Sequence, residues 1–409
     1  MSSLKNKPEL LSPVGDMERL DAALCFGADA VYIGGNEFGM RVAAANFGYE
    51  QMKKATDAAH SLSKRIYLTC NTLPTNSEMD RMQEYLKNAA LCGVDAFIVS
   101  DIGVLTLLKN TLPDAEVHIS TQAGIVNYAS ANAFYQMGAS RVVLARELSF
   151  DDIKTIRDKT NPNLELETFV HGAMCMSFSG RCTISNYMTN RDANRGECSQ
   201  PCRWQYYLME QKRPGEYFPV FEEKEGTYIL NSKDLCMIEH IDKLCDAGIS
   251  SLKIEGRAKS SYYVAVVTNA YRNVMDYYFE NGTMPDEDNR WMYEEVYKVS
   301  HREYTTGFYF GRPENGQCYQ SGGYVRNYDI AAIVDGYKDG RVYMTAKNGM
   351  SEGQSVEVLS PGKKPFEVTV KSLCDAEGNA AENANHPMAQ YSFECQTAVS
   401  KGSIIRIGK

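Results

Sequence analysis

The sequence contains no uninterrupted apolar run of about 18 residues, the length that a membrane-spanning helix requires. It therefore predicts a protein without a membrane segment. The opening residues, MSSLKNKPELLSPVG, also lack the apolar core of an export signal, so we expect a cytoplasmic protein. Basic residues are in deficit, with 43 Lys and Arg against 52 Asp and Glu. The resulting net charge of −9 argues against a surface coated for nonspecific nucleic-acid binding, although a local basic surface remains allowed.

The chain has 409 residues, which is long for one domain and suggests two or three. Hydrophobic residues make up 44% and charged residues 23%, as in ordinary globular proteins. A chain of this length can bury a large core without disulfides or metal.

The first three quarters of the chain repeat one unit, a short apolar run followed by an amphipathic stretch. Each run is rich in Val, Ile, Leu or aromatic residues, as expected for a strand that is buried on both faces. Eight such units predict a (β/α)8 TIM-like barrel, and a doubly wound open sheet is the alternative. The eight runs are residues 9–15, 30–35, 65–71, 96–101, 116–122, 141–147, 164–172 and 251–257.

The unit between the seventh and eighth runs is much longer than the others and carries a cluster of cysteines. We therefore expect a long insertion, at about residues 172–250, within a barrel domain of residues 1–304. Residues 305–409 contain short alternating runs and a hairpin signal at Asp339-Gly340. They predict a small all-β, barrel-like C-terminal domain.

Polar residues close the apolar runs, at the ends where a barrel of this type has its active site. Each could instead cap the following helix, but a group that converges on one mouth favours a site. Arg146, Arg257 and Gln122 are candidates for holding anionic or base groups. The full set of candidate catalytic residues is Gln122, Arg146, Glu147, His171, Glu255 and Arg257, and Asn71 and Asp101 end two further runs.

Four of the twelve cysteines, Cys175, Cys182, Cys198 and Cys202, lie in residues 167–204, and Cys236 follows them. A reducing cytosol makes a disulfide framework the least favoured interpretation. A structural zinc site usually has two pairs of closely spaced ligands, and here only Cys198 and Cys202 form such a pair. The C-x3-C-x2-C pattern of radical-generating clusters is absent, because Gln205 occupies the third position. Irregular spacing on Gly- and Ser-rich loops favours an iron–sulfur cluster, with zinc and unligated thiols left open.

Residues 167–185, ETFVHGAMCMSFSGRCTIS, resemble the signature of the collagenase-like unassigned peptidase family thirty-two. The resemblance covers nearly the whole chain, and the terminal β-domain is similar to that of the family's RNA-hydroxylating branch. Other matching phrases are MRVAAANF, HISTQAGIVN, RVVLAREL, NRGECSQPCRW, SKDLC and KIEGRAKSSYYVA.

The resemblance implies a 4Fe–4S cluster on Cys175, Cys182, Cys198 and Cys236, with Cys202 as an alternative to Cys198. It also implies oxygen-independent hydroxylation of carbon 5 of the tRNA wobble uridine, with prephenate as a co-substrate. Arginine grips carboxylates in bidentate fashion, which makes a diacid ligand chemically sensible. A sister branch implies hydroxylation of a 23S rRNA cytidine as an alternative. The family name suggests a peptidase, but no H-E-x-x-H motif is present.

The expected partner is the anticodon loop of tRNA, whose bases are already partly unstacked. The insertion is locally basic over residues 171–204, because this stretch contains four arginines and only two acidic residues, Asp192 and Glu197. Those arginines are Arg181, Arg191, Arg195 and Arg203, and Trp204, Tyr206 and Tyr207 could stack on bases or pack in the core. A paralogous or homo-oligomeric partner is left open.

Overall fold

The computed structural model describes most of the chain, with gaps that fall mainly in the insertion. The described residues are 7–39, 46–174, 184–191, 193, 197–201, 204, 207–208, 214–215, 218–219, 222–223, 226–227, 233–311 and 325–409. By their contacts they divide into two compact units, which are described separately below. The first unit holds residues 1–20, 29–258 and 302–324, and the second holds 21–28, 259–301 and 325–409.

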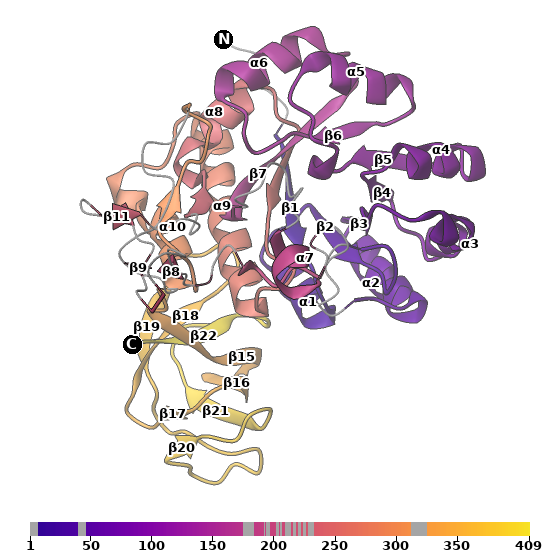
Figure 1. Ribbon diagram of the computed structural model, residues 1–409. Coiled ribbons are helices and arrows are strands. Elements are labelled where there is room, and N and C mark those ends of the chain that lie inside the picture. The colour runs from indigo at the N-terminus through magenta and orange to yellow at the C-terminus, as the bar shows by residue number, and fades with distance from the viewer. Residues whose placement is uncertain are drawn as a thin grey trace. The chain divides into compact units, whose positions relative to one another are not determined.

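Eight parallel strands form a closed barrel in the first unit (Figure 1). Closure is direct, because the last strand, β13, pairs in parallel with both the first, β1, and the seventh, β7. The predicted TIM-like barrel is therefore confirmed, and the open-sheet alternative is excluded. The strands are β1 (Glu9–Pro13), β2 (Ala30–Gly34), β3 (Arg65–Cys70), β4 (Ala96–Val99), β5 (Glu116–Ile119), β6 (Arg141–Val143), β7 (Glu165–Ala173) and β13 (Ser251–Ile254).

Helices follow the strands, and α4 (Ile102–Thr111) and α6 (Phe150–Lys159) each begin at a capping side chain. The Asp101 carboxylate accepts the N–H of Val104, and the Ser149 hydroxyl accepts that of Asp152. Such caps satisfy amide groups that have no partner within the helix. The helices are α1 (Met17–Cys25), α2 (Tyr49–Ser61), α3 (Asn76–Leu91), α4 (Ile102–Thr111), α5 (Tyr128–Gln136), α6 (Phe150–Lys159) and α8 (Ile241–Asp246), with 3-10 turns η1 (Thr121–Ala123) and η5 (Ile238–His240).

The insertion between β7 and β13 extends the barrel sheet on one side. Strand β12 (Asp234–Cys236) pairs antiparallel with the last residues of β7, and β14 (Tyr304–Thr305) pairs in parallel with β12. The sequence analysis did not predict these two strands. The insertion also holds α7 (Ile184–Thr189) and the short strands β8 (Tyr207–Leu208), β9 (Phe218–Pro219), β10 (Glu222–Glu223) and β11 (Gly226–Thr227).

The second unit combines a long helix with an antiparallel sheet. Its helical part is α9 (Ser261–Asn281), η6 (Glu287–Asn289), α10 (Trp291–Glu294) and η7 (Glu295–Lys298). Its main sheet has the order β19-β18-β22-β15-β16-β21. The strands of the unit are β15 (Tyr328–Lys338), β16 (Arg341–Ala346), β17 (Met350–Ser351), β18 (Ser355–Leu359), β19 (Phe366–Thr369), β20 (Asn383–Ala384), β21 (Gln390–Glu394) and β22 (Ile404–Gly408).

This sheet curls into a partly open barrel. The chain after β19 covers the outer edge of β21, where Cys374 and Ser392 exchange backbone hydrogen bonds. The predicted hairpin turn joins β15 to β16, with φ of 51° at Asp339 and 77° at Gly340. The predicted all-β, barrel-like C-terminal domain is therefore confirmed. The domain boundary between residues 304 and 305 stays a prediction.

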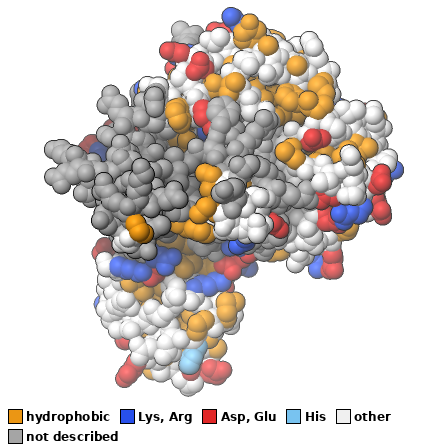
Figure 2. All heavy atoms as spheres, in the orientation of Figure 1, with side chains coloured by type: hydrophobic (Ala, Val, Ile, Leu, Met, Phe, Trp, Pro, Cys, Tyr) orange, Lys and Arg blue, Asp and Glu red, His pale blue; other side chains and the backbone are white. Residues whose placement is uncertain are grey.

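None of the helices in the described residues is long and apolar enough to cross a membrane. Acidic and basic side chains are interspersed on the face that Figure 2 shows, with hydrophobic side chains between them.

Candidate active site at the barrel mouth

Arg146 and Glu255 meet at the carboxyl ends of β6 and β13. The Nη2 of Arg146 donates to the Oε2 of Glu255 at 3.1 Å, and its Nη1 donates to the Ala173 carbonyl at 2.8 Å. The guanidinium lies 3.8 Å from the centre of the Phe169 ring. Both charged side chains are less than one fifth exposed. Two of the predicted residues thus form a partly buried ion pair, beside which Glu147 is half-buried.

Arg257 lies flat against the backbone of Gly34 at the end of β2. Its Nη1 donates to the Thr69 hydroxyl at 3.2 Å, and its Nη2 donates to the Asn46 side-chain oxygen at 2.6 Å. A Cβ atom at position 34 would lie well inside contact distance of the guanidinium. Glycine therefore makes room for this arginine, whose side chain is buried. Neither Asn46 nor Thr69 was predicted from the sequence, because nothing in a single strand reveals its neighbour across the barrel.

A serine links three neighbouring strand ends. The Ser100 hydroxyl, after β4, lies 3.2 Å from the Asn71 carbonyl oxygen, after β3, and 3.1 Å from the Oε1 of Gln122, on η1 after β5. Gln122 is half-buried at this position. Asp101, the next residue, instead caps α4.

His171 and Cys236 lie opposite each other on adjacent strands. The antiparallel register pairs Cys236 of β12 with His171 of β7. Directly opposed residues of an antiparallel pair project from the same face of the sheet. His171 is buried, its Nε2 lies 3.4 Å from the Tyr304 hydroxyl, and its carbonyl accepts the N–H of Glu255 at 2.9 Å. The pairing therefore brings one of the clustered cysteines next to a predicted catalytic residue.

Two of the predicted cluster ligands fall within the described residues. Cys198 and Cys236 are of intermediate exposure, and the Sγ of Cys198 accepts the N–H of Gln200 at 3.4 Å. Among the described residues no group of three His, Cys, Asp or Glu side chains could hold a metal ion. Cys175, Cys182 and Cys202 lie outside the described residues, so the ligand set stays a prediction.

Most of the predicted RNA-facing residues also fall outside the described residues. These are Arg181, Arg195, Arg203 and Tyr206. Arg191 is exposed and Trp204 is 46% exposed, so both reach solvent. Tyr207 begins β8, and its contacts stay undescribed.

The opposite end of the barrel lumen is closed by an ionic network that sequence reasoning missed. Arg141 contacts Glu9 at 2.6 Å and Glu167 at 3.0 Å, and Lys253 contacts Glu167 at 2.7 Å. Burial acts to raise the pKa of Glu167, but Lys253 and Arg141 outweigh it and hold the pKa at about 2. One indication of this network was present in the sequence, because several of the apolar runs begin with a charged residue. Because this network is internally paired, we assign it to stability.

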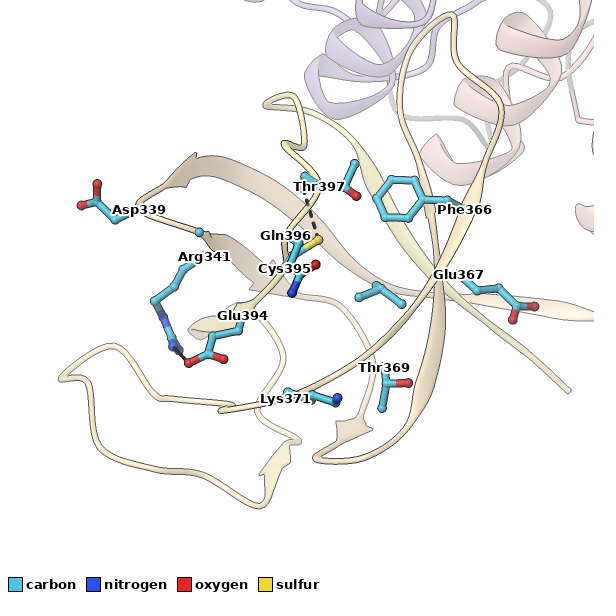
Figure 3. A pocket seen from close by; sticks show the side chains of 12 residues that line it. Asp339, Arg341, Phe366, Glu367, Thr369, Lys371, Glu394, Cys395, Gln396 and Thr397 are labelled. Atoms are coloured by element: carbon cyan, nitrogen blue, oxygen red, sulfur yellow. Dashed lines mark hydrogen bonds and ion pairs between the residues drawn. The ribbon is translucent and has the colours of Figure 1, made fainter.

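A cavity of about 690 Å³ lies in the C-terminal unit, and none of the predicted site residues lines it. The Arg341–Glu394 ion pair, at 3.8 Å, lies on one side and the Phe366 ring on another (Figure 3). The Cys395 thiol donates to the Thr397 carbonyl at 3.2 Å, and burial raises the pKa of this thiol. A raised pKa disfavours a nucleophilic thiolate.

The same unit contains the pattern G-x-S-x-G at residues 349–353. In serine hydrolases this pattern forms a sharp turn from a strand to a helix. Here Ser351 lies in the two-residue strand β17, which pairs with β20, and its hydroxyl donates to Asn383 at 2.7 Å. The local structure is therefore not that of a nucleophile elbow.

Comparison with known proteins assigns the chain to a family. The model of "Peptidase family U32" matches residues 15–318, and that of "Peptidase family U32 C-terminal domain" matches residues 326–406. The chain belongs to peptidase family U32. The resemblance predicted from its motifs is thereby confirmed.

Three related proteins illustrate the similarity. The tRNA hydroxylation protein P1 of Bacillus subtilis is 36% identical over 409 residues, covering 99% of this chain and 96% of that protein. The tRNA hydroxylation protein P of Escherichia coli is 35% identical, covering 91% and 90%. The 23S rRNA 5-hydroxycytidine C2501 synthase of Escherichia coli is 39% identical, covering 68% of this chain but only 40% of that protein.

Proposed function

We propose that this U32 protein is a tRNA-modifying enzyme that hydroxylates carbon 5 of the wobble uridine without molecular oxygen. The observation that carries the proposal is similarity over the full length, including the C-terminal domain, to proteins named for tRNA hydroxylation. The barrel mouth supports it, because a buried arginine, a partly buried arginine, an amide and a histidine occupy the strand ends of the face where such barrels perform chemistry.

The cofactor in this proposal is a 4Fe–4S cluster held by Cys175, Cys182, Cys198 and Cys236. The described residues fit it in two respects. Cys236 and Cys198 are half-buried cysteines, and the N–H donated to Cys198 resembles the backbone hydrogen bonds that stabilise cluster sulfurs. When bound, the cluster would supply electron transfer or an iron coordination site at the mouth.

The proposed co-substrate is a prephenate-like diacid. Arg257 is the best placed group to bind a carboxylate, because Asn46, Thr69 and Gly34 fix its guanidinium in a buried position. Arg146 is already paired with Glu255, so it would orient this carboxylate rather than bind a second anion. In this proposal the Gln122 amide and His171 contact the uracil base.

The function is tested by deleting the gene and measuring tRNA nucleosides by mass spectrometry, in cells grown without oxygen to remove any aerobic bypass. We expect 5-hydroxyuridine derivatives to disappear and to return when the intact gene is restored. Unchanged derivatives in a strain without a paralogue would contradict the proposal. Loss of a ribosomal hydroxycytidine instead would support the second candidate, the 23S rRNA activity named in one relative.

The cofactor is tested on protein purified without air. We expect iron and sulfide in nearly equal amounts and a brown colour, which Cys236→Ala abolishes. Cys245→Ala is the matched control, because Cys245 is a buried thiol in α8, nine residues further along the chain. Stoichiometric zinc without sulfide would refute the cluster. Loss of the cluster in Cys202→Ala but not in Cys198→Ala would show that Cys202, and not Cys198, is the third ligand.

A further inference from the structure

Three exposed apolar side chains lie on neighbouring connections at the barrel mouth. Leu73 follows β3, Ile102 begins α4 after β4, and Val126 follows β5 and η1; they are 51%, 55% and 38% exposed. The strands β3, β4 and β5 are consecutive in the barrel, so their connections adjoin at its carboxyl end. We call these three residues the apolar rim.

The apolar rim is continuous with the candidate site. The Ser100 hydroxyl contacts both the Asn71 carbonyl and the Gln122 side chain, which ties the same three connections together. Leu73 and Ile102 each lie two residues beyond a member of this link, and Val126 lies four beyond Gln122. The apolar rim therefore lies on the same three connections that hold Gln122 at the mouth.

Exposed apolar groups beside a polar site need an explanation, because binding loops occupy this face of the barrel. The charged neighbour of Ile102, Asp101, directs its carboxylate at the α4 amide of Val104. The three rim side chains themselves carry no charge.

We infer that the apolar rim binds the unstacked nucleobases that flank the target base in a single-stranded RNA loop. The inference rests on the proposed function and adds the surface that holds the substrate. A base presents a large uncharged face, which packs on apolar side chains regardless of its identity. A phosphate would need a cation, and the rim offers none.

A protein occupant fits the apolar rim less well. Stable protein–protein interfaces bury about 1,200–2,000 Å². Three half-exposed side chains present on the order of a few hundred Å², which is the size of an ordinary functional patch on a monomer. This area suits two or three bases better than a folded partner.

The experiment measures the affinity of the full chain for an anticodon stem-loop RNA with an unmodified wobble uridine. Replacing Leu73, Ile102 and Val126 together by Ser should raise Kd about tenfold, as expected when base packing is lost. The dependence of Kd on salt should keep its wild-type slope, because no phosphate contact is removed. Binding to an RNA duplex of equal length should not change.

Leu91→Ser is the matched control, because Leu91 lies at the other end of α3 and is 81% exposed. It should leave both affinities unchanged. If the triple variant misfolds, the three single variants provide the test, after each has been shown to keep the wild-type melting temperature. The inference would be overturned if the triple variant bound the RNA as tightly as the wild type, or if its dependence of Kd on salt had a reduced slope. It would also be overturned if the triple variant lost a dimer but kept its affinity for RNA.

The same RNA separates this inference from the proposed function. If wild-type protein binds the stem-loop and supports 5-hydroxyuridine formation while the rim variants do both equally well, only the rim inference fails. If wild-type protein does neither, both the proposed function and the inference that rests on it are wrong.

Discussion

Glu167 shows how one side chain can stabilise the barrel from inside. It is fully buried between Lys253 and Arg141, and its pKa is held at about 2, against 4.5 for a free glutamate. The unfolded chain therefore takes up a proton near pH 4.5, whereas the folded chain resists protonation until about pH 2. The stabilisation from this group is present above pH 4.5 and disappears as the pH falls towards 2.

We expect Glu167→Gln to lower the free energy of unfolding by about 3–5 kcal/mol at pH 7, because Lys253 is left buried without its carboxylate. The variant should also lose much of the acid sensitivity that the wild type shows between about pH 4.5 and 2. Urea unfolding at several pH values measures both effects. Glu165→Gln is the control, since Glu165 also contacts Arg141 but is 44% exposed; an equal loss in the two variants would contradict the argument.

Gly34 offers a second test at this scale. Gly34→Ala would place a Cβ in the position of the Arg257 guanidinium and displace it from Asn46 and Thr69. We expect hydroxylation to fall at least tenfold while the chain still folds. Gly39→Ala is the control, because the nearest atom to its Cβ would be at an ordinary 3.6 Å. Full activity in Gly34→Ala, assayed by nucleoside mass spectrometry, would show that Arg257 need not be held there.

At the scale of elements, the barrel strands were predictable and their partners were not. Runs such as AVYIG at β2 are apolar throughout, because both faces of a barrel strand are buried. Strand β12 has three residues and pairs with β7 across about 60 intervening positions, so no local pattern reveals it. The Arg146–Glu255 pair escaped prediction for the same reason. The sequence predicted that the candidate mouth residues lie at strand ends, but it did not predict which of them contact each other.

The turn η7 is attached to the C-terminal sheet by buried charges. Arg406 of β22 is fully buried and donates to Glu295 at 2.8 Å, and Lys298 contacts Glu357 of β18 at 3.0 Å. Glu295→Ala should destabilise this unit by about 3 kcal/mol, because the buried guanidinium loses a partner. Glu294→Ala, an exposed neighbour, should change stability by less than about 0.5 kcal/mol. Equal effects in denaturant unfolding would refute the role of the buried pair.

For the whole molecule, the two family models and the two compact units do not divide the chain at the same place. The models separate between residues 318 and 326, whereas residues 259–301 belong to the same compact unit as residues 325–409. The helical segment thus matches the first model in sequence but packs in the second unit. The buried Arg406–Glu295 contact and the Gly362–Asn269 hydrogen bond, at 2.9 Å, are among the links.

A protease site introduced within residues 312–324 tests this organisation. After cleavage, we expect the two pieces to elute together in size-exclusion chromatography under native conditions, because residues 259–301 of the first piece remain packed on the second. They should separate only in denaturant. Adding Glu295→Ala and Lys298→Ala should promote separation, since the ion pairs to Arg406 and Glu357 are then lost. Separation of the unmutated pieces in native buffer would show that the segment belongs to the barrel alone, and that the C-terminal domain is an independent attachment.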